Sequence, residues 1–282
     1  MNETGWRIVL ITTVPPVAQS LVSFLRESGH EPVAVLSARW TGAPRADRPP
    51  MDDQAAPAGL DLLLARDKWS IEPLLRAERP DLVLCWGFPW RIPLAALQVP
   101  RLGSVNCHPA LLPRHRGPIP LAWAFREGDS QFGVTWHRMD AELDTGSILA
   151  QATVPMQDDD FSIDVVGPRI GAVAIGLLPT VLARVAAGDP GDPQPTDGAT
   201  WAGHFGDDYA TVDWSWPARR IHDQVRAWAF TFGLSPVVGP VAGLDGGRVR
   251  LVRTSLIDPG GGARRVESGD GPLWVVESEP LD

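Results

Sequence analysis

The chain has 282 residues, of which 44% are hydrophobic and 21% charged, and its formal net charge is −9. This length and composition predict a globular protein with one large domain and at most a small addition. An acidic chain repels nucleic acid unless a local basic face compensates. From His204 to the C-terminus the sequence has eight arginines against eleven acidic residues, so no such face is indicated there.

Neither a membrane segment nor a signal peptide is indicated. The sequence lacks a run of about 18 apolar residues, which is the length that a membrane-spanning helix requires. The N-terminal stretch MNETGWRIVLITTV has no basic region and no cleavage site. Cys85 and Cys107 are too few for a disulfide framework, which favours a reducing compartment. We therefore expect a cytoplasmic protein that does not associate with membranes.

The first part of the chain alternates strands and helices. The apolar, β-branched run at residues 7–14 predicts a strand covered on both faces, followed by a helix up to Gly29 and a second strand at 31–38. After a Pro- and Asp-rich loop at 39–57 come a short helix and a buried strand at 82–85. This order predicts a parallel sheet, which binds ligands beyond the carboxyl ends of its strands. Residues 86–90 are thus a candidate ligand loop, unless their tryptophans merely cover the core.

The second part is expected to complete the sheet and to end in short strands. The expected elements are a strand at 102–109, a loop at 110–120, a helix at 121–127 and a strand at 132–139. A long apolar helix is expected to begin after Ser162 as its cap and to stop at Gly188, and a linker follows it. The last expected elements are a helix capped by Ser215, with Pro217 in its first turn and Ile221, Val225 and Ala229 on one face, and short β-strands from 233 to 282.

These elements predict an α/β fold: a Rossmann-like, mostly parallel sheet with helices on both faces, plus a small C-terminal β-rich subdomain. We expect a catalytic domain at 1–188, a linker at 189–210, and a C-terminal helix with its β subdomain at 211–282. The β subdomain could pair edge to edge in a homodimer, although nothing in the pattern requires this.

The segment VNCHP places two polar side chains side by side. Alternate residues of a strand share a face, so Asn106 and His108 point the same way, about 6.6 Å apart along the chain, while Cys107 points into the packing. The proline after His108 keeps that residue extended. A lone histidine is more often structural, but an amide paired with an imidazole at a strand end favours a catalytic site.

The segment LDTGS, with Asp144, is also found in aspartic proteases. Such enzymes need two aspartates that share a proton, and this α/β chain has one D-T-G segment. We therefore expect Asp144 to act on His108, holding its tautomer and favouring its charged form. Asn106 can donate to a developing oxyanion. Together these groups suit acyl transfer to an amine, which needs no serine or cysteine nucleophile.

The residues from Asn106 to Gln151 resemble the core of the folate-dependent formyltransferases. That family has the pattern Asn-x-His-Pro-Ser-Leu-Leu-Pro-x-x-Arg-Gly, then Gly-Val-Thr-x-His, then Asp-x-Gly-x-Ile. The matching residues are Asn106, His108, Pro109, Leu111, Leu112, Pro113, Arg116, Gly117, Gly133, Val134, Thr135, His137, Asp144, Gly146 and Ile148. The opening strands and the late VDWSWPARRIHDQVRAW segment are also similar. Ala110 departs from the pattern, because the family usually has serine there.

The resemblance implies 10-formyltetrahydrofolate as formyl donor. We expect no metal, because His108, His115 and His137 lack a tight ligand spacing and the reaction needs none. The resemblance also implies a catalytic trio of Asn106, His108 and Asp144. It further implies donor-binding residues at Trp86, Gly87, Phe88, Pro89, Leu102, Asp140 and Leu143. The expected acceptor-binding residues are Arg114, Arg116 and Gly117, although Arg114 and His115 are equally compatible with solvated loop charges. His137 matches a family position and could act in the site or only pack beneath it.

The acceptor is left open by the resemblance. The best-known family member formylates methionyl-tRNA with the help of a basic loop after its second strand and a larger C-terminal domain. Here the corresponding residues 38–53 mix acidic and basic side chains, and the C-terminal part is short and acidic. We therefore expect a small-molecule amine, such as an amino sugar or amino acid in natural-product biosynthesis. Methionyl-tRNA formylation, hydrolysis of the formyl donor and folate binding without turnover are the alternatives.

Overall fold

A computed structural model describes residues 5–39, 51, 56, 57 and 59–281. The described chain forms two compact units, each of which is described by itself. The first unit comprises residues 1–113, 134–152 and 171–198, and the second comprises residues 114–133, 153–170 and 199–282. Most of the expected loop at 39–57 lies outside the described residues. The domain boundaries expected from the sequence stay a prediction.

A seven-stranded sheet forms the centre of the first unit, with the strand order β3-β2-β1-β4-β5-β6-β7. Five neighbouring strands run parallel, and β6 pairs with β5 in the antiparallel sense. The mostly parallel α/β sheet expected from the sequence is therefore confirmed. The strands are β1 (Arg7–Ile11), β2 (Glu31–Ala38), β3 (Asp61–Ala65), β4 (Leu82–Trp86), β5 (Ser104–His108), β6 (Gln131–Arg138) and β7 (Ile148–Pro155).

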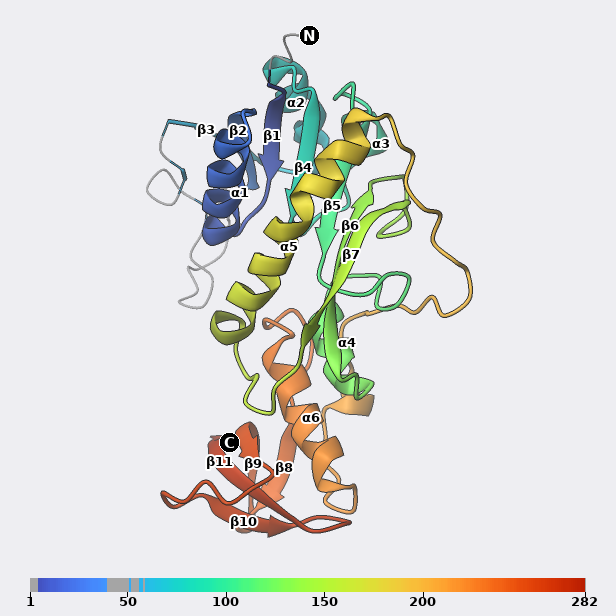
Figure 1. Ribbon diagram of the computed structural model, residues 1–282. Coiled ribbons are helices and arrows are strands. Elements are labelled where there is room, and N and C mark those ends of the chain that lie inside the picture. Colours follow the sequence, from blue (N-terminus) through green and yellow to red (C-terminus); the bar gives the residue numbers. More distant parts are fainter. Residues whose placement is uncertain (1–4, 40–50, 52–55, 58, 282) are drawn as a thin grey trace. The chain divides into compact units, whose positions relative to one another are not determined.

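Helices follow the strands at the places that the apolar spacing predicts, with some additions (Figure 1). The helices are α1 (Pro15–Glu27), α2 (Ile71–Glu78), α3 (Leu94–Leu97), α4 (Pro120–Arg126), α5 (Ile163–Ala186) and α6 (Ala218–Ala229), with 3-10 turns η1 (Lys68–Ser70) and η2 (Asp207–Tyr209). The expected strand ends and helices are matched within a few residues. Strands β3 and β7 and helix α3 were not expected from the sequence.

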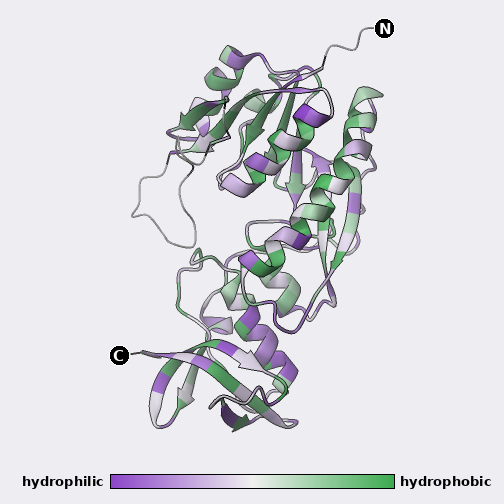
Figure 2. Cartoon of the chain, turned by 60° about the vertical axis from the view of Figure 1, so that its left-hand side comes forward, coloured by the Kyte–Doolittle hydropathy of each residue, from purple (hydrophilic) through white to green (hydrophobic). Residues whose placement is uncertain are grey.

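The core of the first unit lies on the strands β1, β2 and β4 and the helices beside them. Strand β1 is buried from Ile8 to Ile11, as the continuous apolar run predicts for a strand covered on both faces. Val9, Val83 and Leu75 belong to one buried cluster, which joins the centre of the sheet to α2. Figure 2 shows the same pattern as apolar colour along the strands of this sheet.

Helix α5 is long and apolar enough to cross a membrane, judged by length and composition alone. This differs from the expectation that the sequence contains no apolar segment of that length. Ser162 caps its start, since its hydroxyl accepts a hydrogen bond from the amide of Asp164 at 3.1 Å. Its buried residues recur at every third or fourth position, as in a helix that packs one face on a protein core. In the first unit Trp136 of β6 donates from Nε1 to the carbonyl oxygen of Ala174 at 2.9 Å, which ties α5 to the sheet.

The second unit contains a four-stranded antiparallel sheet in the order β10-β11-β9-β8, which confirms the expected C-terminal β-rich part. Its strands are β8 (Val241–Leu244), β9 (Gly247–Ser255), β10 (Arg264–Glu267) and β11 (Pro272–Leu281). Ile221 and Val225 of α6 are buried in one cluster with Leu251 and Leu273 of this sheet. The apolar face of α6 therefore forms the core of the unit.

Two details of α6 differ from the sequence-based expectation. Ser215 does not cap the helix, because its hydroxyl and amide both bind the Asp213 carboxylate, at 2.7 and 2.9 Å. The cap comes instead from Asp270, whose carboxylate accepts a hydrogen bond from the amide of Ala218 at 2.7 Å. Ala229 is exposed, since the helix ends there and the buried face stops at Trp228.

Candidate active site

Two strands bring polar side chains together in the first unit. β5 ends at His108, and β6 lies antiparallel beside it in a register that sets Asn106 opposite His137. The amide nitrogen of Asn106 lies 3.2 Å from Nε2 of His137. Asn106 and His108 lie two residues apart on one strand and share a face, whereas Cys107 is buried in the packing.

The turn that carries Asp144 is held in a fixed conformation. Its φ of 57° lies in the left-handed region, which aspartate tolerates at a cost of about 1 kcal/mol. Gln194 donates from its amide nitrogen to the carbonyl oxygens of Asp144 and Gly146, at 2.9 and 2.7 Å. A Cβ at position 146 would lie 1.8 Å from the carbonyl oxygen of Arg138, so only glycine fits there.

The carboxylate of Asp144 lies at the centre of this group. Its Oδ2 is 3.6 Å from Nδ1 of His108, and its Oδ1 is 3.5 Å from Nε2 of His137 and 3.4 Å from the amide nitrogen of Asn106. Its side chain is only 10% exposed, and both histidine rings are buried. These distances lie at the long end of the range for hydrogen bonds.

The tautomer of His137 follows from its contacts. Nδ1 lies 2.7 Å from the carbonyl oxygen of Arg138, and a carbonyl can only accept, so Nδ1 carries the proton. In the neutral ring Nε2 is then an acceptor, and Asn106 donates to it. The two N–H groups of Asn106 are therefore directed at His137 and Asp144. His137 is a member of the polar group and does not merely pack beneath it.

Both thiols near this group are unsuited to nucleophilic attack. Burial raises the pKa of Cys85 far above its ordinary value, and the negative charge of Asp144 raises it further. Burial likewise raises the pKa of Cys107. Because the thiolate is the nucleophilic form, neither cysteine provides a covalent route. The arrangement can polarise a carbonyl and exchange a proton, which suits direct attack by an external nucleophile.

The sequence matches a known family model. Residues 7–182 match the model described as formyl transferase. The chain is 33% identical over 287 residues to the methionyl-tRNA formyltransferase of Halorhodospira halophila, covering 97% of this chain and 91% of that protein. The chain belongs to the formyltransferase family.

Solved structures agree with the fold of this formyltransferase. HypX of Aquifex aeolicus in complex with tetrahydrofolic acid superimposes with a TM-score of 0.68 at 19% identity, and the match covers 98% of this chain. This chain spans only 44% of the length of HypX. The N-formyltransferase of Helicobacter canadensis, in complex with folinic acid and dTDP-3-aminofucose, has a TM-score of 0.67 at 15% identity and covers 96% of this chain and 98% of its own.

The predicted donor loop at 86–90 is anchored to the turn after β1. Gly87 has a φ of 69°, and its carbonyl accepts hydrogen bonds from the amide and hydroxyl of Thr13, at 3.2 and 2.9 Å. Trp86 is buried, with its ring 6.1 Å from that of Trp136 in an edge-on contact. The core-covering alternative therefore describes Trp86. Phe88 and Pro89 follow it on the loop, where Phe88 packs partly against the core.

The other predicted donor residues have diverse surroundings in the first unit. Leu102 is half-buried, and its carbonyl accepts a hydrogen bond from Arg138 at 2.8 Å. Asp140 accepts hydrogen bonds from the amide of Glu142 and the hydroxyl of Thr145, at 3.1 and 2.7 Å, so it shapes the loop that leads to Asp144. Leu143 directly precedes Asp144 in the sequence and is 40% exposed.

The predicted acceptor residues belong to the second unit. Arg114 pairs with Asp129 at 2.7 Å, and the same carboxylate lies 2.8 Å from Nε2 of His115. The backbone of Arg116 forms a parallel β-bridge with Trp201. A Cβ at Gly117 would lie 3.2 Å from the ring of the same tryptophan. These residues therefore build the loop after β5. Their contact with an acceptor stays a prediction.

Several supporting residues were not singled out from the sequence. Thr135 donates to the carbonyl of Ala110 at 2.6 Å and accepts from the amide of Leu112 at 3.3 Å. Gln151 donates to Thr135 and to the carbonyl of Leu112, at 2.7 and 3.0 Å. These bonds order the loop where Ala110 lacks the usual serine hydroxyl. In the part of the chain that the structure describes, His, Cys, Asp and Glu form no group of three or more that could hold a metal ion.

Proposed function

We propose that this formyltransferase transfers the formyl group of 10-formyltetrahydrofolate to a primary amine, and that the amine is the α-amino group of methionyl-tRNA. The observation that carries the proposal is the convergence of Asn106, His108 and Asp144, which places an amide, an imidazole and a carboxylate within 3.6 Å contacts. Such a set can both stabilise an oxyanion and remove a proton.

In this proposal the donor supplies an activated formyl group, and the acceptor amine attacks its carbon. A new bond forms from that carbon to the amine nitrogen, the bond to the folate nitrogen breaks, and the folate nitrogen takes up a proton. Charged His108 donates to the formyl oxygen as negative charge builds on it. The proton that the amine loses passes to the coupled pair of His108 and Asp144.

Asn106 has a more constrained role than the sequence suggested. Its bond to Asp144 at 3.4 Å is longer than its contact with His137 at 3.2 Å. We infer that the formyl oxygen takes the place of Asp144 as acceptor of the second N–H, while His137 keeps the amide in its orientation. A buried donor with a weak partner loses little when it exchanges that partner for a developing oxyanion.

The residues around the site fit a folate donor. The loop at 86–90 offers backbone groups and the side chains of Phe88 and Trp90, whose rings are 5.4 Å apart. The left-handed φ of Gly87 allows the backbone to turn sharply there. HypX and the Helicobacter canadensis enzyme are described with tetrahydrofolic acid and folinic acid, respectively, which supports a folate for this chain.

The choice of acceptor rests on the relatives. The methionyl-tRNA formyltransferase of Halorhodospira halophila aligns over nearly the whole chain, including the C-terminal unit. This favours methionyl-tRNA over the small-molecule amine that we expected from charge. The expected role in natural-product biosynthesis has no support from the comparisons. The buried, free cysteines fit a cytoplasmic site of action.

An amino sugar linked to a nucleotide is the second candidate. Two observations favour it: the excess of acidic residues after His204, and the Helicobacter canadensis structure with dTDP-3-aminofucose, which matches this chain almost end to end. The test is a competition between acceptors. Purified enzyme is given 10-formyltetrahydrofolate with methionyl-tRNA or with nucleotide-linked amino sugars, and formylated product is identified by mass. Product from the amino sugar alone would replace the first proposal with the second.

A further inference from the structure

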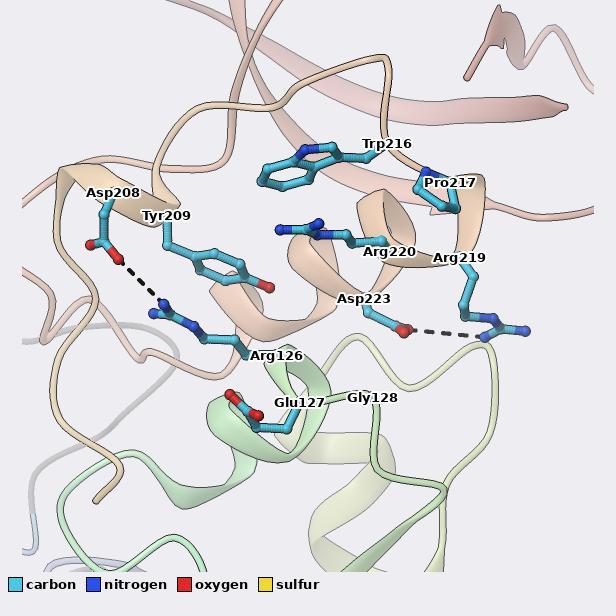
Figure 3. Close-up of a pocket in the computed structure, with 10 residues that line it drawn as sticks. All are labelled: Arg126, Glu127, Gly128, Asp208, Tyr209, Trp216, Pro217, Arg219, Arg220 and Asp223. Carbon is cyan, nitrogen blue, oxygen red and sulfur yellow. Dashed lines mark hydrogen bonds and ion pairs between the residues drawn. The ribbon is translucent and has the colours of Figure 1, made fainter. Parts of the chain in front are cut away.

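A pocket of about 530 Å³ lies within the second unit, between α4, η2 and the start of α6 (Figure 3). Its volume is within the range of small-molecule sites, which is about 300 to 1,000 Å³. Its lining includes Arg126, Asp208, Tyr209, Trp216, Arg220 and Asp223. None of these residues belongs to the catalytic group or to the predicted donor and acceptor sets.

Two arginines of the pocket are held against aromatic rings. The guanidinium of Arg220 lies 3.7 Å from the ring centre of Trp216, and Figure 3 shows the indole over it. The guanidinium of Arg126 lies 4.4 Å from the ring centre of Tyr209 and 4.5 Å from that of Trp123. Stacking restricts a guanidinium to one orientation, so less entropy is lost when it binds a ligand.

The carboxylates of the pocket do not neutralise Arg220. Among the described residues no carboxylate forms an ion pair with it within 4.0 Å, and Asp213, which is hydrogen-bonded by Ser215, attracts it only from a longer distance. Asp223 is closer to Arg226 and lies 4.0 Å from Arg219. Arg220 is therefore an exposed, oriented cation available to an anion from outside.

Arg126 has only a loose partner. Its guanidinium lies 3.3 Å from the carboxylate of Asp208, whose side chain is 70% exposed. The side chain of Arg126 is 24% exposed, so it is the exposed carboxylate of Asp208 that an incoming anion would have to displace. Arg220 also occupies the first turn of α6, where a positive charge opposes the helix dipole. This position of the charge is unfavourable for the stability of the helix, so helix stability does not account for an arginine there.

We propose that this pocket binds a nucleotide unit, with its phosphate on the guanidinium of Arg220, its base on the face of that guanidinium that Trp216 does not cover, and Arg126 as a second cation of the same pocket. Arginine recognises phosphate through two parallel N–H bonds and stacks on planar bases. The nucleotide is either part of an RNA chain or free. For an RNA chain the inference rests on the proposed function, because it names where the acceptor tRNA is held, whereas for a free nucleotide it goes beyond that function.

Equilibrium binding to the full chain, measured without formyl donor, tests the proposal. Because no formyl transfer takes place in this assay, its result does not depend on whether the proposed reaction occurs. The probes are uncharged tRNA, free nucleoside mono- and diphosphates, and inorganic phosphate. Arg220→Gln removes the charge and the stack. Arg265→Gln is the matched control, because Arg265 is an exposed arginine of the same unit that pairs with Glu267 outside the pocket.

We expect Arg220→Gln to weaken binding of tRNA or of a free nucleotide by about 10-fold, while Arg265→Gln binds like the wild type. If tRNA is the affected probe, the salt dependence of its binding should also fall by about one unit of slope. The probe that responds identifies the source of the nucleotide. Equal affinities of the wild type and Arg220→Gln for every probe would overturn the proposal. Binding of inorganic phosphate as tight as that of any nucleotide would also overturn it.

Discussion

The carboxylate of Asp144 lies 3.6 Å from Nδ1 of His108, although helix α4 and strand β6 lie between the two residues in the sequence. His108 ends β5, and Asp144 sits in a left-handed turn that Gln194 fixes. In the proposed mechanism this contact determines the charge of the imidazole. Substitution of the carboxylate is therefore the most direct probe of the pair.

We predict that Asp144→Asn lowers kcat for formyl transfer by at least about 100-fold, because the amide can neither charge His108 nor share the proton of the amine. Affinity for the stable 5-formyl analogue should stay within about threefold, since loss of one proton acceptor does not remove the donor loop. Steady-state kinetics and titration measure the two quantities. Asp159→Asn, an exposed carboxylate of the second unit, is the control and should behave as wild type.

His137 offers a separate test of how Asn106 is oriented. His137→Leu leaves the half-buried amide of Asn106 without its 3.2 Å partner, which should lower kcat by about 10-fold, because the amide is then no longer held in its orientation. His137→Gln keeps an acceptor and should retain most of the activity. Equal rates for the two variants would show that His137 acts only through packing.

Gly146 should tolerate no side chain. In Gly146→Ala the new Cβ would meet the carbonyl oxygen of Arg138 at 1.8 Å, so the turn must move and carry Asp144 with it. We expect destabilisation of about 1–3 kcal/mol and a large loss of kcat. Gly176→Ala is the matched control, because its Cβ meets no atom within 4 Å and alanine favours the helix. Thermal melts and kinetics of both variants provide the comparison.

The surroundings of His222 predict that the second unit loses stability at acidic pH. Burial lowers its pKa to about 4, and its ring lies 3.0 Å from the carbonyl oxygen of Asp158 and 2.9 Å from the hydroxyl of Thr254. A carbonyl only accepts, so Nε2 carries the proton and Nδ1 accepts from Thr254. The neutral form is therefore the one that the fold stabilises.

Above the ordinary histidine pKa of 6.5, His222 is neutral in both the folded and the unfolded chain and adds no pH dependence. As pH falls from 6.5 to about 4, only the unfolded chain takes up the proton, and stability should fall by ~3 kcal/mol in total. Denaturant unfolding of the wild type and His222→Gln across this range measures the effect. Parallel pH curves for the two proteins would contradict it.

The cap of α6 gives a prediction in which sequence and structure differ. Asp270→Ala removes the acceptor for the Ala218 amide and should cost about 1 kcal/mol of stability. Ser215→Ala removes a bond to Asp213 at an exposed turn and should change stability by less than about 0.5 kcal/mol. Unfolding midpoints in the reverse order would restore Ser215 as the cap.

The sequence predicted features that depend on local pattern. The apolar run of β1 and the spacing of Asn106 and His108 follow from strand geometry, and both appear as expected. Strand β7 was missed because only Leu149 and Val154 are buried along it, which breaks the alternation that marks a strand. Strand β3 was also missed, because it is short, it follows a long loop, and Ala65 is the one residue along it that is fully buried.

Features that depend on distant contacts could not be predicted. Gln194 reaches the Asp144 turn from a segment 50 residues away, and the pattern of a Pro- and Gly-rich linker says nothing of that contact. Asp270 caps α6 from 52 residues away, in preference to the nearby Ser215. The pairing of His137 with Asn106 needed the register of β5 and β6. Each depends on how the chain folds back on itself.

The central claim is formyl transfer from a folate to an amine, and release of tetrahydrofolate from 10-formyltetrahydrofolate tests it most directly. The enzyme is assayed with no acceptor, with methionyl-tRNA and with nucleotide-linked amino sugars. We predict release only when an acceptor is present, in step with formylated methionyl-tRNA. Release at the same rate in water alone would make the enzyme a hydrolase of the formyl donor and would contradict the account.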